Sequence, residues 1–213
     1  PLGRYLISDM LPSMKKAICI HGHYYQPPRE DPVTGEVPIQ PSAAPWRDWN
    51  TRINEECYRA ACHSPILDGS MRVVERMNLY ESMSFDVGPT LMRWLIKHAP
   101  DVYRAIQEAD RASCERLNGA GNAMTQGYHH VILPLANQRD KQTELRWAIA
   151  DFTHRFGRRP SSCWLPETAA DYPTLEAMVD EGLSYVLLAP GQCEAVRPIG
   201  EETPWRPNDG VDT

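Results

Sequence analysis

The sequence lacks any apolar run long enough to cross a bilayer, and its first residues lack the apolar segment of a secretory signal peptide. It also lacks internal repeats and low-complexity tracts. Positive charge is scarce, since 22 Lys and Arg stand against 28 Asp and Glu for a formal net charge of −6. Nucleic acids and anionic membranes bind basic surfaces, so we expect neither as a partner. What remains is an ordinary globular composition, 42% hydrophobic and 23% charged, long enough for one domain.

Paired cysteine motifs are absent as well. None of the six cysteines belongs to a Cys-x-x-Cys pair, and Cys19 and Cys163 lie inside apolar, strand-like segments. Disulfide frameworks and zinc knuckles require paired cysteines. We therefore predict reduced thiols, with Cys19 and Cys163 packed in a core, and a cytoplasmic protein. Arg155, Arg158 and Arg159 form the densest basic group, which is predicted to be a solvated helix end.

Short apolar runs alternate with longer segments of helical periodicity. Residues 1–13 differ from the rest and are interpreted as an extension or an expression remnant, which leaves 14–213 as the folded part. Strands are predicted at Ala17–Ile20, Glu81–Val87, Asn122–Gln126, Ser162–Leu165 and Tyr185–Leu188.

Helices are predicted between these strands. One spans about 140–156 and ends at Gly157, and two others follow Pro89 and Pro100. A further helix begins after Asp171 as its N-cap, and it is expected to bury Leu175, Met178 and Val179.

Strand and helix in alternation predict a parallel sheet covered by helices, an α/β fold. Four or five strands are too few for an eight-stranded barrel, which needs ~250 residues. The polar, turn-rich residues 203–213 close no element. We therefore expect an incomplete or truncated barrel of parallel strands.

Three segments at predicted strand ends carry candidate functional groups. In the first, His21–Pro28, alternate residues of an extended segment point the same way, so His21 and His23 share a face suited to a metal ion or to ligand hydroxyls. In the second, Gly127–Leu135, His130 is expected to face the site.

In the third segment, an apolar strand runs directly into Glu167, at the position where barrel enzymes project catalytic groups. The alternative is a glutamate that stabilises the start of a helix. Since Asp171 already occupies the better capping position, we favour a catalytic role for Glu167. The proline-rich stretch from Pro27 to Pro45 is predicted to be a functional loop, with Trp46 and Trp49 either stacking on sugar rings or anchoring the loop to the core.

These three segments resemble, in order, the first three signature regions of glycoside hydrolase family 57, and a bacterial family-57-like subgroup in particular. The resemblance spans about Met14 to Pro190. The family's Trp-x-Pro-Glu motif matches Trp164–Glu167, and its second-region histidine matches His130. The first region departs from the usual His-x-His-Gln-Pro, because Tyr24 and Tyr25 separate His23 from Gln26.

The resemblance implies an incomplete (β/α)7 barrel and a retaining glycosidase or glycosyl-transferring enzyme on α-glucans or related α-glycosides. Glu167 would be the nucleophile, and the expected substrate-site residues are His21, His23, Gln26, His130, Trp164 and Trp46. We expect an oligo- or polysaccharide substrate and no metal or other cofactor.

A retaining enzyme needs a second carboxyl group as acid/base. The family's acid/base is an aspartate of a later strand, and no segment here matches it. Asp86 follows an early strand and Asp171 is expected to cap a helix, so the acid/base is expected to be missing from this chain, which alone is expected to be inactive.

Two other hypotheses remain. A metal-dependent hydrolase would use His21, His23 and His130, with Glu167 completing the shell. A non-catalytic carbohydrate-binding protein would keep the pocket without turnover.

Overall fold

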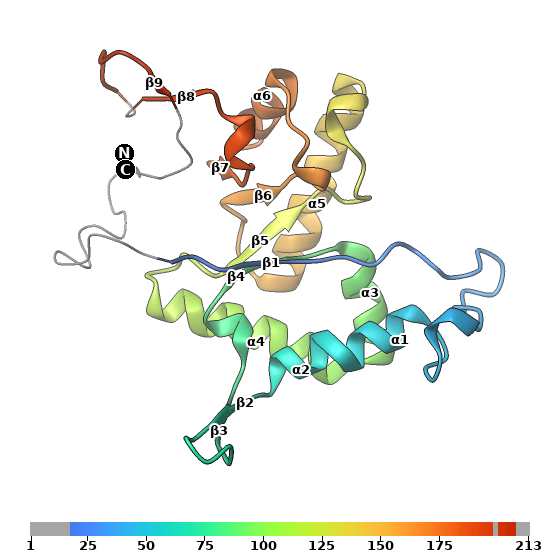
Figure 1. The fold of residues 1–213 in the computed structure, drawn as a ribbon. Helices are drawn as coiled ribbons and strands as arrows, with labels where there is room; N and C mark the ends of the chain where they lie inside the picture. The colour runs from blue at the N-terminus through green and yellow to red at the C-terminus, as the bar shows by residue number, and fades with distance from the viewer. Residues whose placement is uncertain (1–17, 198–199, 208–213) are drawn as a thin grey trace.

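A parallel five-stranded sheet organises the structure, a computed structural model that describes residues 18–197 and 200–207. Its strand order is β1-β4-β5-β6-β7, and every neighbouring pair runs parallel (Figure 1). The strands are β1 His21–Tyr24, β4 Ser84–Val87, β5 Ala123–Gln126, β6 Ser162–Trp164 and β7 Tyr185–Val186. The predicted α/β fold with parallel strands is thus confirmed. The proposed extension 1–13 lies outside the described residues.

Helices connect the strands. They are α1 Trp49–Ile53, α2 Arg59–Cys62, α3 Pro89–His98, α4 Pro100–Arg116, α5 Gln138–Phe156 and α6 Tyr172–Asp180, with a π-helical turn Asn54–Tyr58 between α1 and α2. Short 3₁₀ turns occupy Pro41–Ala43, Leu79–Glu81, Leu133–Leu135, Pro166–Thr168 and Pro190–Gln192. Among the described residues, no helix is long and apolar enough to span a membrane.

The start of α6 and the end of α5 lie where the sequence predicts them. The Asp171 carboxylate accepts the Thr174 backbone N–H at 2.9 Å and so caps α6. Gly157 ends α5 with φ 69°, in the left-handed region that glycine adopts without steric cost. The buried side of α6 consists of Thr174, Ala177 and Met178.

One face of the sheet packs against helices. Phe85 of β4 and Ala123 of β5 are buried with residues of α3 and α4 in a single cluster. A second cluster joins Leu145 and Ile149 of α5 to Cys163 of β6 and Met178 of α6. Because strand side chains alternate between faces, the neighbours of Phe85, namely Ser84 and Asp86, lie on the opposite side of β4.

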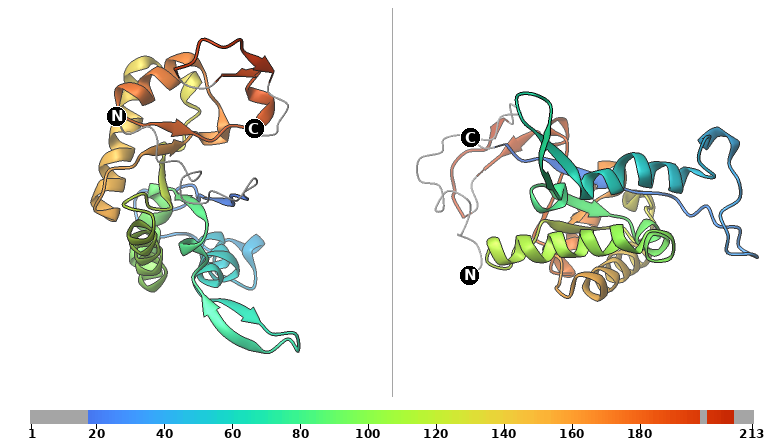
Figure 2. Two further views of the ribbon diagram at one scale, coloured as in Figure 1. Left: turned by 90° about the vertical axis from the view of Figure 1, so that its left-hand side faces the viewer. Right: turned by 90° about the horizontal axis from the view of Figure 1, so that it is seen from below.

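A hairpin that the sequence did not reveal projects from the molecule. Strands β2 Ser64–Leu67 and β3 Val73–Met77 pair antiparallel and extend away from the sheet (Figure 2). Near the other end of the described chain, β8 Ala195–Val196 pairs antiparallel with β9 Arg206–Pro207.

The first strand lies further along the chain than predicted. Ala17 lies outside the described residues, and β1 begins at His21 rather than within the apolar run. Its partner β4 begins at Ser84, which pairs with His21, so residues before Ile20 have no strand opposite them in β4. Cys19 is consequently exposed, against the prediction, whereas Cys163 is buried as predicted.

Two other predicted environments are wrong. Val179 is 71% exposed, because it lies beside the buried stripe of α6 rather than on it. Arg158 is not a solvent-exposed residue at a helix end, because its side chain forms an ion pair at 2.7 Å with Asp110, whose side chain is 2% exposed. Arg155 likewise pairs with Asp151 at 2.7 Å.

Candidate active site

Polar and aromatic side chains from four neighbouring strands gather on the face of the sheet opposite α3 and α4. They come from His21 and His23 of β1, Asp86 of β4, Gln126 at the end of β5 and Trp164 at the end of β6. The strand register pairs His23 with Asp86 and Gln126 with Trp164. The segments that follow β5 and β6 carry His130 and Glu167. The cluster therefore lies toward the carboxyl ends of the strands, where parallel α/β proteins form their sites.

Asp86 is the centre of this cluster and is fully buried. Its Oδ1 lies 2.9 Å from His21 Nε2, and its Oδ2 lies 2.8 Å from His23 Nδ1. The amide Nε2 of Gln126 donates a third hydrogen bond to Oδ2 at 2.7 Å. A buried carboxylate is costly unless such bonds satisfy it, so Asp86 and these three partners form one unit. The prediction that His21 and His23 share a face is confirmed by this common contact.

Aromatic stacking holds the same histidines from another side. The Trp164 ring stacks on His23 at 4.7 Å and on His21 at 5.2 Å between centroids. Its indole Nε1 and the Gln126 Oε1 are buried without a partner among the described residues. One is a donor and the other an acceptor, on residues paired in the sheet register.

His130 joins the cluster through His23 and Tyr25. Its Nε2 lies 3.2 Å from His23 Nε2, and its ring stacks on Tyr25 at 3.8 Å between centroids. Burial and the nearby His23 lower the pKa of His130 below its ordinary value, although the negative charge of Glu167 opposes this shift. His130 is therefore neutral near pH 7, and Glu167 is close enough to influence its proton.

The backbone around the site is strained. His130, Glu167 and Thr168 adopt φ values of 57°, 58° and 51°, in the left-handed region that residues with a side chain rarely occupy. Such conformations cost about 1–3 kcal/mol each and concentrate at functional sites. Glu167 itself is exposed in the turn Pro166–Thr168. Asp171 caps α6 as described above, which leaves the Glu167 carboxylate without a capping role.

Gln26 and Trp46 lie elsewhere in the loop that follows β1. Gln26 is buried, donates to Tyr58 Oη at 2.8 Å and accepts a hydrogen bond from Arg29. Trp46 is half-buried, and its backbone N–H donates to Ala43 O at 3.1 Å. Among the described residues its ring stacks on no ring of the histidine cluster. Trp49 is held to the loop by a hydrogen bond from its indole N–H to Ser42 at 3.0 Å.

The histidines are not arranged as metal ligands. Both ring nitrogens of His21 are occupied, Nδ1 by Ser84 Oγ at 3.0 Å and Nε2 by Asp86. Within the described part of the chain, no group of three or more His, Cys, Asp or Glu side chains is placed to hold a metal ion.

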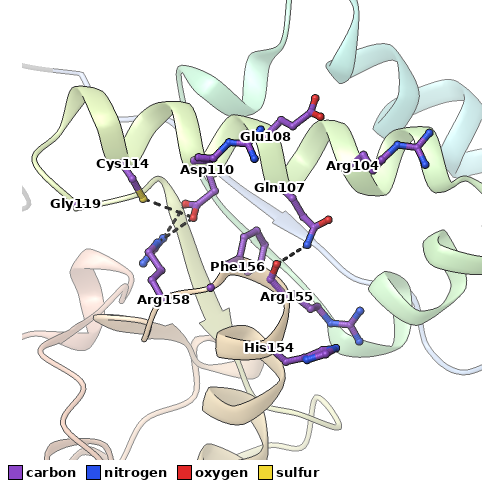
Figure 3. Close-up of a pocket in the computed structure, with 12 residues that line it drawn as sticks. Arg104, Gln107, Glu108, Asp110, Cys114, Gly119, His154, Arg155, Phe156 and Arg158 are labelled. Atoms are coloured by element: carbon purple, nitrogen blue, oxygen red, sulfur yellow. Dashed lines mark hydrogen bonds and ion pairs between the residues drawn. The ribbon is translucent and has the colours of Figure 1, made fainter.

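A surface pocket of about 690 Å³ lies between α4 and the end of α5, near the amino ends of β5 and β6 (Figure 3). Its most buried charges neutralise each other, because the Arg158 guanidinium donates two hydrogen bonds to Asp110, at 2.9 and 2.7 Å. The pocket is lined by residues that lead into β5 and β6, so it is separate from the histidine cluster.

Three residues of the site were not predicted as its members from the sequence: Ser84, Asp86 and Gln126. Ser84 and Asp86 alternate with Phe85 and Val87, and that polar stripe was the available signal. The partners of Asp86 come from β1 and β5, and their register is set by tertiary pairing.

The structure thus defines a parallel α/β protein with a histidine, carboxylate and tryptophan site at its strand ends. The family model for glycosyl hydrolase family 57 matches residues 23–192. The chain belongs to this family, which confirms the resemblance found in its motifs.

Individual relatives match with low identity. Alpha-amylase 1 of Dictyoglomus thermophilum is 24% identical over 99 residues, which are 46% of this chain and 13% of that protein. The 4-α-glucanotransferase of Thermococcus litoralis matches with a TM-score of 0.50 and 13% identity over 80% of this chain. A maltose-forming amylase of Pyrococcus sp. ST04 matches with a TM-score of 0.52 and 16% identity over 79% of this chain. The chain spans 22% and 28% of those two structures, respectively, so they support the fold only.

Proposed function

We propose that this chain is part of a retaining glycoside hydrolase or glycosyl-transferring enzyme that acts on α-glucans or related α-glycosides. Membership of glycosyl hydrolase family 57 supports the reaction class. The relative named above as an alpha-amylase supports the substrate class.

Glu167 is the proposed nucleophile. The observation that carries this assignment is its strained backbone, φ 58°, in the turn after β6, with the carboxylate exposed beside His130. An exposed carboxylate on such a turn is accessible to a ligand, and strained backbone conformations concentrate at functional sites. In the proposed reaction Glu167 attacks the anomeric carbon while the glycosidic bond breaks and the acid/base protonates the leaving oxygen. Water or a sugar hydroxyl, deprotonated by the same acid/base, then displaces Glu167 from the glycosyl-enzyme.

The acid/base would come from outside the described residues. Two carboxyl groups ~5 Å apart are required, and the acid/base must exchange protons with the leaving group. Asp86 is a poor candidate, because it is fully buried and accepts hydrogen bonds from three side chains. We assign His21, His23, His130 and Trp164 to the wall of the proposed substrate site. Gln26 and Trp46, in the loop that follows β1, are proposed as its further members.

Turnover of an activated α-glucoside tests this proposal. The 213-residue chain is compared with a form that continues further along its gene, and Glu167→Gln is introduced into the longer form. We expect turnover only in the longer form, and its loss in Glu167→Gln with the fold retained. Glu176→Gln, a change to a glutamate on the exposed side of α6, is the matched control and keeps full activity.

Two other outcomes would each support one of the two alternative hypotheses from the sequence. A longer form that binds α-glucan without turnover supports the non-catalytic carbohydrate-binding protein. Turnover that survives Glu167→Gln and disappears with a chelator supports the metal-dependent hydrolase.

A further inference from the structure

We infer that Asp86 is a positioning residue that fixes which ring nitrogens of His21, His23 and His130 carry protons. The proton positions follow from the contacts of Asp86, and their importance for catalysis rests on the proposed function. The protonated nitrogen of each histidine depends on its hydrogen-bond partner. Asp86 sets it in His21 and His23, and His23 in turn sets it in His130.

An ionised carboxylate accepts hydrogen bonds and donates none. His21 must therefore carry its proton on Nε2, the atom 2.9 Å from Asp86 Oδ1. Its Nδ1 is then bare and accepts the hydroxyl proton of Ser84 at 3.0 Å. A neutral His21 is fully satisfied by these two partners, so it is a fixed part of the wall.

The second histidine is held in the opposite form. His23 lies 2.8 Å from Asp86 Oδ2 through its Nδ1, so this nitrogen carries the proton and Nε2 is bare. The bare Nε2 lies 3.2 Å from His130 Nε2, which must then donate. Burial and His23 keep the pKa of His130 low, in agreement with a neutral ring.

Asp86→Asn gives a specific prediction, since an amide offers one acceptor oxygen and one donor nitrogen. The Oδ2 position faces two donors, His23 Nδ1 and Gln126 Nε2, whereas the Oδ1 position faces His21 alone. The asparagine oxygen will therefore take the Oδ2 position, and its NH₂ will face His21. His21 must then move its proton from Nε2 to Nδ1 and donate to Ser84.

Ring ¹⁵N NMR of the 213-residue chain at neutral pH measures these protons directly. In the unsubstituted chain we expect protons on His21 Nε2, His23 Nδ1 and His130 Nε2. In Asp86→Asn, the two ring nitrogens of His21 exchange their chemical shifts, while those of His23 keep theirs. The spectrum of the unsubstituted chain already tests the inference if Asp86→Asn does not fold.

Two further variants separate positioning by Asp86 from other effects. Ser84→Ala removes the partner of His21 Nδ1 and should leave the proton on Nε2. Asp110→Asn alters another buried aspartate, remote from the cluster, and should change none of the three rings. Any one of three results would overturn the inference. These are a His21 proton on Nδ1 in the unsubstituted chain, unchanged His21 shifts in a folded Asp86→Asn variant, or a proton that moves to Nδ1 in Ser84→Ala.

Activity distinguishes this inference from the function on which it rests. In the longer form, Asp86→Asn should lower kcat/KM by roughly 10- to 100-fold, the same loss as for groups that orient histidines in metal sites, since the orienting hydrogen bond is of the same kind. If no form turns over an α-glucoside but His21 switches, the proposed function fails and the positioning role stands. If Glu167 is essential but Asp86→Asn changes neither activity nor the rings, the positioning role fails.

Discussion

Replacing Arg158 with methionine should destabilise the protein substantially. Arg158 connects the end of α5 to α4 and β5: its guanidinium donates to both oxygens of Asp110, at 2.9 and 2.7 Å, and to Ala123 O at 2.7 Å. The Ala123 backbone N–H donates in turn to Asp110 Oδ1 at 2.8 Å. Methionine replaces the apolar stem of the arginine side chain and removes all three donated bonds, so Asp110 would remain buried without its counter-charge.

Breaking a buried ion pair by removing one partner costs about 3–5 kcal/mol. We expect about 3 kcal/mol for Arg158→Met, at the low end of that range, because the Arg158 side chain is 18% exposed. Denaturant unfolding followed by circular dichroism measures this loss. The double variant Arg158→Met, Asp110→Asn removes the isolated charge, and it should recover about 1 kcal/mol relative to Arg158→Met.

A loss below about 1 kcal/mol in Arg158→Met would refute this reasoning. So would simple additivity of the two single changes, because residues in one hydrogen-bond network are expected to show coupling.

His130→Gln should remove a pH dependence of stability. Because burial and His23 lower the folded-state pKa of His130, the unfolded chain binds more protons below about pH 6.5. Its contribution to the free energy of unfolding is therefore lost as pH falls through that region, and denaturant titrations at several pH values should show a flatter slope in His130→Gln. Asp48→Ala should cost about 1–2 kcal/mol, because the buried Asp48 carboxylate caps α1 by accepting the Thr51 N–H at 2.8 Å. Asp48→Asn, which retains an acceptor, should lose a few tenths in the same denaturation assay.

Local signals in the sequence predicted the parallel core well. Helix α5 has a clear periodicity and a glycine at its end, and α6 has an aspartate cap, so their bounds lie within two residues of the predicted ones. The hairpin β2–β3 was missed because most of its residues are exposed, which leaves no buried alternation to read. The position of β1 was missed because apolar content favoured Ala17–Ile20, whereas pairing with β4 selects His21–Tyr24.

The candidate site was predictable only in part. The spacing of His21 and His23 indicated a shared face without any knowledge of neighbouring strands. Asp86 was set aside because it belonged to an early strand, yet that strand lies between β1 and β5 in the sheet. The order and register of parallel strands depend on the helices that connect them, so the sequence alone could not show that Asp86 faces both histidines.

The left-handed backbone at Glu167 and Thr168 has a consequence for how this protein tolerates mutation. Glycine at Thr168 would relieve the local strain, yet it would also widen the conformational range of the unfolded chain. These effects oppose each other, so global stability would change little while the turn that carries Glu167 lost its rigidity. A screen for thermal tolerance would pass such a variant unnoticed. Glycine at this position therefore needs to be assessed by function, since a melting temperature carries almost no information about it.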